Sequence, residues 1–238
     1  MANAIRKNIP NVLTCSNLIS GCIATTVAFQ GDAKWALAWM IIGAVFDFFD
    51  GMVARLLHVS SPIGKELDSL ADDITFGVAP ATILFSELRV IDYPAMLESW
   101  RQVIPYLAYL IAAFSALRLA KFNLDERQSM GFIGLPTPAN ALFWGSLMAG
   151  GAAWFESGTW GLPVLLLMIC FSCWILVSEI PMFALKFKHW GWKGNEVRYI
   201  FLALCIPLLL LFRIRAFAII VLCYAVISIV VFLRNQNQ

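Results

Sequence analysis

Charged residues are scarce in this sequence. Only 13% of its 238 residues are Asp, Glu, Lys or Arg, whereas ordinary soluble domains carry about 25%. Hydrophobic residues make up 61% of the chain and gather in long runs. Because such runs are typical of membrane-spanning helices, the sequence predicts an all-α, polytopic membrane helix bundle in which residues 1–238 form one domain.

Several other features are missing as well. No internal repeat or low-complexity tract is visible, and the first apolar run has no small-residue cleavage pattern, so no cleavable signal peptide is expected. The only two histidines, His58 and His189, are expected to be interfacial polar residues rather than catalysts. The net charge of +2 indicates no particular partner, and no nucleic-acid partner is predicted.

The six cysteines all lie inside apolar runs, which argues against a disulfide framework. They are expected to be small residues that face lipid or the core. Cys170 and Cys173 form a CxxC pair, but nothing nearby supplies further soft ligands, so neither a metal site nor a redox site is expected there.

Eight apolar segments predict about eight transmembrane helices. They are residues 11–30, 35–55, 64–86, 103–121, 136–155, 162–185, 198–212 and 216–233. A short stretch with Arg6, Lys7 and Pro10 precedes the first segment and is expected to lie along the interface. The core of the domain is expected over residues 9–212, with residues 213–238 as a final turn and helix.

The basic residues predict that both termini are cytoplasmic. With the N-terminus inside, twelve of the 17 Lys and Arg fall on the cytoplasmic side, as the positive-inside rule favours. The twelve are Arg6, Lys7, Arg55, Lys65, Arg118, Lys121, Arg127, Lys186, Lys188, Lys193, Arg198 and Arg234. A location in the cell membrane follows, with residues 47–72 at its cytoplasmic surface.

Residues 47–72, DFFDGMVARLLHVSSPIGKELDSLAD, interrupt the apolar runs with paired aspartates. Asp47 and Asp50 are three apart, so they share one face of a helix. Asp68 and Asp72 are four apart and share a face of a second helix, and residues 56–63, with Pro62, predict the turn between them. Folded on that turn, the two helices would point four carboxylates at one another.

Such crowding needs compensation. One Asp at the centre of a membrane helix costs roughly 2.5–3.5 kcal/mol, so four approach about 10 kcal/mol before their mutual repulsion is counted. A position near the interface relieves part of this cost. Divalent cations can offset the rest, because Mg²⁺ and Mn²⁺ prefer oxygen ligands.

The same residues resemble the motif of the CDP-alcohol phosphotransferase family, Asp-x2-Asp-Gly-x2-Ala-Arg-x8-Gly-x3-Asp-x3-Asp. All eight fixed positions match, at Asp47, Asp50, Gly51, Ala54, Arg55, Gly64, Asp68 and Asp72. The resemblance implies transfer of a phosphoryl-containing group from a CDP-linked donor to an alcohol inside the membrane, with Mg²⁺ or Mn²⁺, in two ions, as cofactor. It also implies a homodimer.

The resemblance assigns roles to these residues. Asp47, Asp50, Asp68 and Asp72 are the expected metal ligands, and Asp72 is also the candidate general base, since a carboxylate beside the metals can take the proton of an attacking hydroxyl. The CDP moiety is expected to contact Asp47, Asp50, Gly51, Ala54, Arg55, Gly64 and Asp68. Gly51, Ala54 and Gly64 lack bulk, which suits either a nucleotide or close helix packing, and Arg55 suits either a phosphate or a membrane anchor.

Three further stretches narrow the acceptor. DSLADDITFGVAPA (68–81), RLAKFN (118–123) and GLPTPAN (134–140) resemble the phosphatidylserine synthase branch of the family, in which Arg usually stands where this chain has Lys121. The resemblance implies CDP-diacylglycerol and L-serine as substrates. Arg118, Lys121 and Arg198 are the candidate residues for the serine carboxylate, with the membrane-anchor reading open for each.

Two alternatives remain at this point. Within the family, glycerol 3-phosphate or an inositol phosphate could be the acceptor, which would want a denser basic pocket. Outside it, the acids could form the path of a cation transporter, but a transporter would spread its acids through the bilayer depth, and here they gather at one end.

Overall fold

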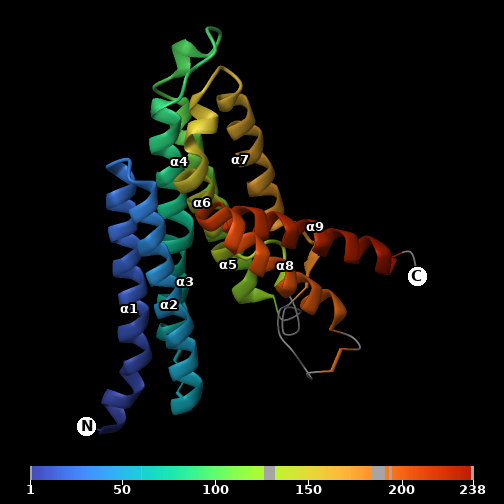
Figure 1. Cartoon of the computed structure of the whole chain (residues 1–238). Helices are drawn as coiled ribbons and strands as arrows, with labels where there is room; N and C mark the ends of the chain where they lie inside the picture. Colours follow the sequence, from blue (N-terminus) through green and yellow to red (C-terminus); the bar gives the residue numbers. More distant parts are fainter. Residues whose placement is uncertain (1, 60, 126–131, 184–190, 193–194, 237–238) are drawn as a thin grey trace.

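The computed structural model describes residues 2–59, 61–125, 132–183, 191–192 and 195–236, and helices dominate them (Figure 1). The α-helices are α1 Ala2–Phe29, α2 Ala33–Leu57, α3 Pro62–Asp72, α4 Ala79–Val90, α5 Leu110–Leu124, α6 Thr137–Glu156, α7 Gly161–Val177, α8 Glu196–Phe212 and α9 Ala216–Gln236. Shorter elements are the π-helix η1 Asp73–Val78, the 3₁₀ turns η2 Glu98–Trp100, η3 Ile104–Tyr109 and η5 Arg213–Arg215, and the strands β1 Phe132–Ile133 and β2 Pro181–Met182. The predicted all-α class is confirmed.

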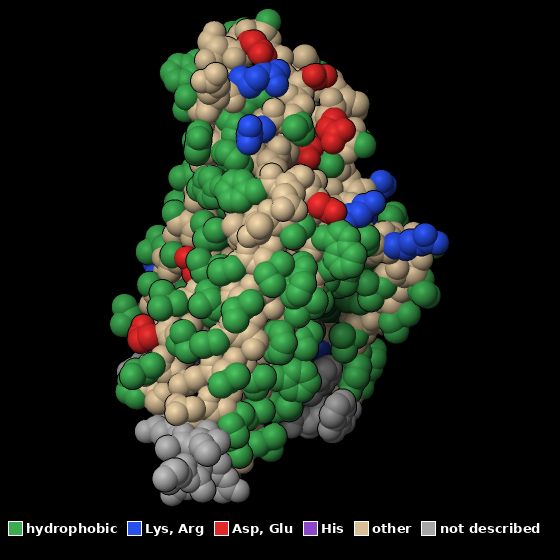
Figure 2. All heavy atoms as spheres, turned by 90° about the vertical axis from the view of Figure 1, so that its left-hand side faces the viewer, with side chains coloured by type: hydrophobic (Ala, Val, Ile, Leu, Met, Phe, Trp, Pro, Cys, Tyr) green, Lys and Arg blue, Asp and Glu red, His purple; other side chains and the backbone are tan. Residues whose placement is uncertain are grey.

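Within the described residues, four helical stretches are long and apolar enough to cross a membrane. They are Asn8–Phe29, Ala33–Leu57, Ile104–Leu124 and Glu196–Arg234, the last of which comprises α8, η5 and α9. Hydrophobic side chains cover most of one face between the ends of the molecule (Figure 2). These features fit a multi-pass membrane protein, whereas the count of eight spans and the orientation of the termini stay predictions.

The first two helices form a hairpin along one side of the molecule (Figure 1). Asp32 caps α2 by accepting a hydrogen bond from the backbone N–H of Trp35 at 3.0 Å. At its other end, α2 stops at His58 in the left-handed conformation, and Ser61 caps α3 by accepting from Gly64 N–H at 2.9 Å. The predicted turn between the aspartate-bearing helices is therefore confirmed, and it is short.

The third predicted segment, residues 64–86, is not one regular helix. It divides into α3, the π-helical turn η1 and α4. Pro80 lies in the first turn of α4 and has no N–H to donate to the carbonyl of Phe76. The N–H of Ala79 bonds to the carbonyl of Ile74, which is five residues back rather than the usual four. In this wider helical turn, Thr75, Phe76 and Gly77 are buried in the protein interior.

Two other predicted bounds were wrong. The first helix begins at Ala2 rather than at residue 11, so residues 6–10 continue α1, which tolerates Pro10 within it, and their place along the interface stays a prediction. The sixth segment ends at Val177 rather than at residue 185, because the chain turns extended at Ser178 and β2 pairs with β1 in an antiparallel register of Phe132 with Met182. Pro181, which has no N–H, suits this strand and not a helix.

The core lies between α1, α2, α4, α6 and η1. Trp144, Phe76, Met40 and Leu84 are among its fully buried side chains. Helices α8 and α9 lie across the direction of the other helices in Figure 1, with α9 packed on α6. The predicted positions of Arg127, Lys186, Lys188, His189 and Lys193 lie outside the described residues.

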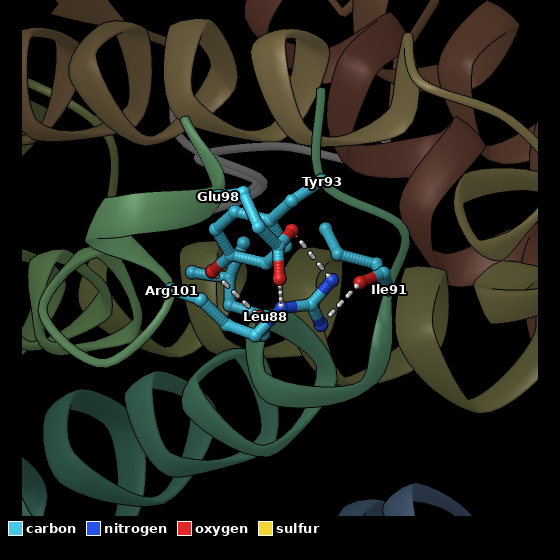
Figure 3. Close-up of polar contacts among 5 residues, drawn as sticks. All are labelled: Leu88, Ile91, Tyr93, Glu98 and Arg101. Atoms are coloured by element: carbon cyan, nitrogen blue, oxygen red, sulfur yellow. Dashed lines mark hydrogen bonds and ion pairs between the residues drawn. The ribbon is translucent and has the colours of Figure 1, made fainter. Parts of the chain in front are cut away.

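The connection from α4 to η3 is held by a compact polar cluster around Arg101 (Figure 3). The guanidinium donates to both carboxylate oxygens of Glu98, at 2.7 and 3.1 Å, and to the carbonyl of Ile91 at 3.3 Å. It also stacks 4.4 Å from the centre of the Tyr93 ring, while the Tyr93 hydroxyl donates to the carbonyl of Leu88 at 2.9 Å. The charges of Arg101 and Glu98 are therefore paired with each other within the chain.

Candidate active site

The two aspartate pairs meet where α2 faces α3. Asp47 and Asp50 project from the last turns of α2, and Asp68 projects from α3. One carboxylate oxygen from each lies within 4.8 Å of the other two. Asp50 is buried and the other two are half-buried. The expectation that these helices aim their carboxylates at one another is confirmed.

Asp72 ends α3 next to this group. Its carboxylate interacts electrostatically with those of Asp47 and Asp68. The amide of Asn17 in α1 donates to Asp72 Oδ1 at 3.1 Å. Asp72 therefore adjoins the three-aspartate group and has one oxygen already engaged by a neutral donor.

Helix α1 supplies the neutral partners of the aspartates. The hydroxyl of Thr14 donates to Asp50 Oδ2 at 2.7 Å, one turn before Asn17 reaches Asp72. Sequence reasoning missed both residues. The available signal was a polar stripe of Asn11, Thr14 and Asn17 at a spacing of three along an otherwise apolar helix, since a polar side chain inside a membrane helix usually has a function or a partner.

A cavity of about 270 Å³ opens beside the aspartates. Its lining comprises Pro10, Asn11, Thr14, Asp50, Gly51, Ala54, Val59, Ser61, Gly64, Lys65 and Asp68. Of the residues expected to contact CDP, Asp50, Gly51, Ala54, Gly64 and Asp68 line it, while Asp47 lies in the adjoining carboxylate group. Arg55 is exposed and is not among the lining residues.

The two glycines that line this cavity have different surroundings. A Cβ at Gly51 would meet no atom within 4 Å, so a methyl group there would extend into free space. A Cβ at Gly64 would lie 3.0 Å from Ser61 Oγ and 3.2 Å from Asn11 Oδ1, so this glycine lets α3 approach α1. Gly64 therefore suits close helix packing, whereas Gly51 leaves space for a ligand.

The donor set suits a hard divalent cation. Octahedral Mg²⁺ has its ligands at about 2.0–2.1 Å, so two ligands of one ion are at most about 4.2 Å apart. The oxygens of Asp47, Asp50 and Asp68, within 4.8 Å of one another, reach this spacing with small side-chain rotations. All are carboxylates, which Mg²⁺ and Mn²⁺ favour over softer ligands.

The three candidate cations for the acceptor are not equivalent. Arg118 is buried near the end of α5, interacts electrostatically with Asp72, and lies 5.4 Å from the centre of the Phe122 ring. Lys121 is exposed, though both line a small pocket next to Ser178 and Glu179. Arg198 donates to Asn195 Oδ1 at 2.8 Å on α8. Among these three, the structure relates Arg118 to the aspartates.

The end of the RLAKFN stretch also holds α3 in place. Asn123 donates through Nδ2 to Ser69 Oγ at 2.7 Å, and its backbone carbonyl accepts from Lys65 Nζ at 3.1 Å. Ser69 directly follows Asp68 and Lys65 lines the cavity. Two parts of the sequence that are more than 50 residues apart therefore build one site.

Comparison with known families identifies the chain. The family model for CDP-alcohol phosphatidyltransferases matches residues 7–190, a range that includes the aspartates, the cavity and Arg118. The chain belongs to the CDP-alcohol phosphatidyltransferase family. The resemblance expected from residues 47–72 is thus confirmed.

Relatives are about a third identical to the chain over the residues that match. A CDP-diacylglycerol–serine O-phosphatidyltransferase of Bacillus subtilis is 33% identical over 189 residues, which are 79% of this chain and 94% of that protein. One of Mycobacterium leprae is 34% identical, but the match covers 73% of this chain and 57% of that protein. An archaetidylserine synthase of Methanothermobacter thermautotrophicus is 32% identical over 139 residues, 56% of this chain and 54% of that protein.

Proposed function

We propose that this protein is a phosphatidylserine synthase, which transfers the phosphatidyl group of CDP-diacylglycerol to the hydroxyl of L-serine and releases CMP. The observation that carries the proposal is the group of Asp47, Asp50 and Asp68 beside a cavity with small residues in its wall. The names of the bacterial relatives support serine as the acceptor.

The cavity between α1, α2 and α3 is the proposed nucleotide site. Gly51 and Ala54 leave room against the wall of α2, and Lys65 provides a cation for the diphosphate. Asp47, Asp50, Gly64 and Asp68 complete the contacts proposed for the CDP moiety, and exposed Arg55 is the proposed outer phosphate contact. The acyl chains remain in the lipid beside the helices.

Asp47, Asp50, Asp68 and Asp72 are the proposed ligands of the divalent cations, Mg²⁺ or Mn²⁺, in two ions. When bound, such ions offset the charge of the diphosphate and of the departing CMP. The chain's own contribution is to hold the carboxylates in place: Thr14 donates to Asp50 and Asn17 donates to Asp72.

Asp72 is the proposed general base. The serine hydroxyl oxygen forms a bond to the phosphatidyl phosphorus, the bond from that phosphorus to the CMP oxygen breaks, and the hydroxyl proton passes to the carboxylate of Asp72. Arg118, buried and next to Asp72, is the proposed partner of the serine carboxylate, because a guanidinium can bind both carboxylate oxygens. Lys121 and Arg198 are secondary candidates.

The setting follows from this reaction. We place the protein in the cell membrane with the site facing the cytoplasm, where the soluble substrate serine is available, in accordance with the distribution of Lys and Arg. A homodimer remains a prediction from the family resemblance. The lipid bilayer and CDP-diacylglycerol are the expected partners.

The test is an acceptor panel with purified protein in lipid. CDP-diacylglycerol is offered with serine, glycerol 3-phosphate, an inositol phosphate or no acceptor, with Mg²⁺ or Mn²⁺, and CMP release is measured. Release that depends on serine and stops in excess chelator is expected. Release with glycerol 3-phosphate or an inositol phosphate alone would keep the reaction class and overturn the acceptor, and no release with any alcohol would overturn the function.

A further inference from the structure

Asn17 is one of the most enclosed polar side chains in the molecule, and its partners connect it to Thr75. Both residues have 0% exposure. The Thr75 hydroxyl lies 2.8 Å from Asn17 Oδ1 and 3.1 Å from the Asn17 backbone carbonyl, so Asn17 accepts from Thr75. The amide of Asn17 then presents its N–H₂ group to Asp72 Oδ1 at 3.1 Å. The three residues form a chain of hydrogen bonds from η1 through α1 to the end of α3.

This chain fixes which way the amide of Asn17 points. An amide has an accepting oxygen and a donating nitrogen on the same carbon. Because an ionised carboxylate only accepts, the nitrogen faces Asp72, and the oxygen is left to face the Thr75 hydroxyl. Reversal would set Oδ1 against a carboxylate oxygen, an acceptor against an acceptor.

The surrounding backbone is shaped around Thr75. A Cβ at Gly21 of α1 would lie 2.9 Å from the backbone Cα and N of Thr75, and one at Gly43 of α2 would lie 2.6 Å from Thr75 Cγ2 and 2.9 Å from Asn17 Oδ1. Such distances leave no room for a side chain. Two helices thus have glycine where they enclose this pair, and the π-helical turn η1 brings Thr75 inward to fill the space.

We infer that Asn17 and Thr75 are positioning residues for Asp72. Asn17 holds one oxygen of the Asp72 carboxylate, and that carboxylate interacts with those of Asp47 and Asp68. Neither Asn17 nor Thr75 lines the cavity proposed for the nucleotide. The pair therefore affects the reaction and the retention of metal through Asp72 and leaves the fit of the nucleotide unchanged. The inference rests on the proposed function for its kinetic part only.

The chain offers matched variants. Thr75→Val keeps the branched shape and loses the hydroxyl, whereas Thr75→Ser keeps the hydroxyl. Asn17→Ala removes the amide. Ser20→Ala is the control, because Ser20 is equally buried on the same helix but donates to the carbonyl of Ser16 at 2.8 Å within α1.

Two readouts are measured on the full-length protein in lipid. In CMP release, Asn17→Ala should lower kcat by about ten- to hundredfold and Thr75→Val by about tenfold, the effects usual for partners that orient a ligand, while KM for CDP-diacylglycerol changes little. Thr75→Ser should restore kcat, and Ser20→Ala should match the wild type. In thermal unfolding, the Mg²⁺ or Mn²⁺ concentration at which the melting temperature begins to rise should increase about ten- to hundredfold in Asn17→Ala and stay constant in Ser20→Ala.

The outcomes separate this inference from the proposed function. If Thr75→Val and Asn17→Ala both match Ser20→Ala in kcat and in the metal titration, the positioning role is refuted and the function stands. If Asn17→Ala does not fold, Thr75→Val decides, and a wild-type kcat in that variant refutes the role. If the wild type binds metal but releases no CMP with any alcohol, the proposed function fails. The metal titration then still tests whether Asn17 and Thr75 position Asp72.

Discussion

The aspartate group, which includes Asp68 and Asp72 of α3, and the Arg101 cluster, which adjoins the end of α4, treat charge in opposite ways (Figure 3). Around Arg101, a guanidinium and a carboxylate pair with each other, and the backbone carbonyl of Ile91 accepts a further bond. Around Asp50 and Asp72, the neutral side chains of Thr14 and Asn17 donate hydrogen bonds to the carboxylates. Arg118 interacts electrostatically with Asp72.

The difference separates a structural cluster from a binding site. The Arg101 cluster is complete without a ligand, because each charge has its counterpart within the chain. Neutral donors, by contrast, orient the carboxylates and leave their negative charge for a cation to offset. Substitutions in the two regions should therefore have different consequences.

The largest expected effect comes from removing a carboxylate of the aspartate group. Asp68→Asn should lower CMP release more than about a hundredfold, because losing a direct metal ligand costs more than the ten- to hundredfold usual for its supporting partners. Asp47→Asn and Asp50→Asn should behave alike. Glu98→Gln, which removes a carboxylate from the other cluster, should leave the rate near that of the wild type. Similar losses in Asp68→Asn and Glu98→Gln would erase the distinction between the two regions.

The next effect concerns the cation beside the aspartates. Arg118→Lys should keep the charge but lose the two-pronged geometry, so KM for serine should rise about ten- to hundredfold, as expected for one charged hydrogen bond of about 1.5–3 kcal/mol. KM for CDP-diacylglycerol serves as the internal control and should change less. Ethanolamine, which lacks the carboxylate, should be a poor acceptor and should be affected little further. Unchanged serine kinetics would make Arg118 a helix anchor and point to Lys121 or Arg198.

A third effect separates packing from ligand space among the glycines. Gly43→Ala should destabilise the protein by about 1–3 kcal/mol, because the new methyl group meets Thr75 Cγ2 at 2.6 Å. Adding Thr75→Ser removes that carbon and should recover part of the loss in melting temperature. Gly51→Ala is the contrast, since its methyl meets nothing within 4 Å; it should melt like the wild type while raising KM for CDP-diacylglycerol. Equal melting temperatures for all three variants would contradict this division.

The smallest effect is expected at the Arg101 cluster under acid. The hydrogen bond from Arg101 lowers the pKa of Glu98 below its usual value of 4.5. A lowered pKa in the folded state contributes stability above pH 4.5 that is lost as the pH falls through the lowered value. The melting temperature of the wild type should therefore exceed that of Glu98→Gln slightly at pH 7, and the gap should close below pH 4.5. Because the pair is exposed, added salt should also narrow the gap. A gap that widens in acid would contradict the assignment.

Much of the site follows from local spacing in the sequence. Intervals of three and four residues put Asp47 with Asp50, and Asp68 with Asp72, on single helix faces, and Pro62 marks the turn that lets the faces meet. Helical periodicity is a property of neighbouring residues, so it does not need the rest of the fold. The all-α class follows in the same way from the long apolar runs.

The tertiary structure decided which distant residues complete the site. Asn17 lies 55 residues from Asp72 in the chain and Thr75 lies 58 residues from Asn17, so their contacts depend on how α1 packs against α3 and η1. The same packing distinguishes Arg118, which interacts with Asp72, from Lys121 and Arg198, which the sequence could not rank by distance.

The tertiary structure also decided where regular helix stops. A π-helical turn that contains Thr75 and precedes Pro80 lies inside a run that looks uniformly helical, and α7 ends at Val177, before the apolar run is over and ahead of the strand that pairs with β1. Hydrophobicity predicts that a segment is buried or faces lipid. Which group pairs with each backbone N–H and C=O depends on the neighbours that packing brings close. For this protein, the sequence by itself determined the aspartate faces and the membrane-helix class, and packing between helices determined how the aspartates are held.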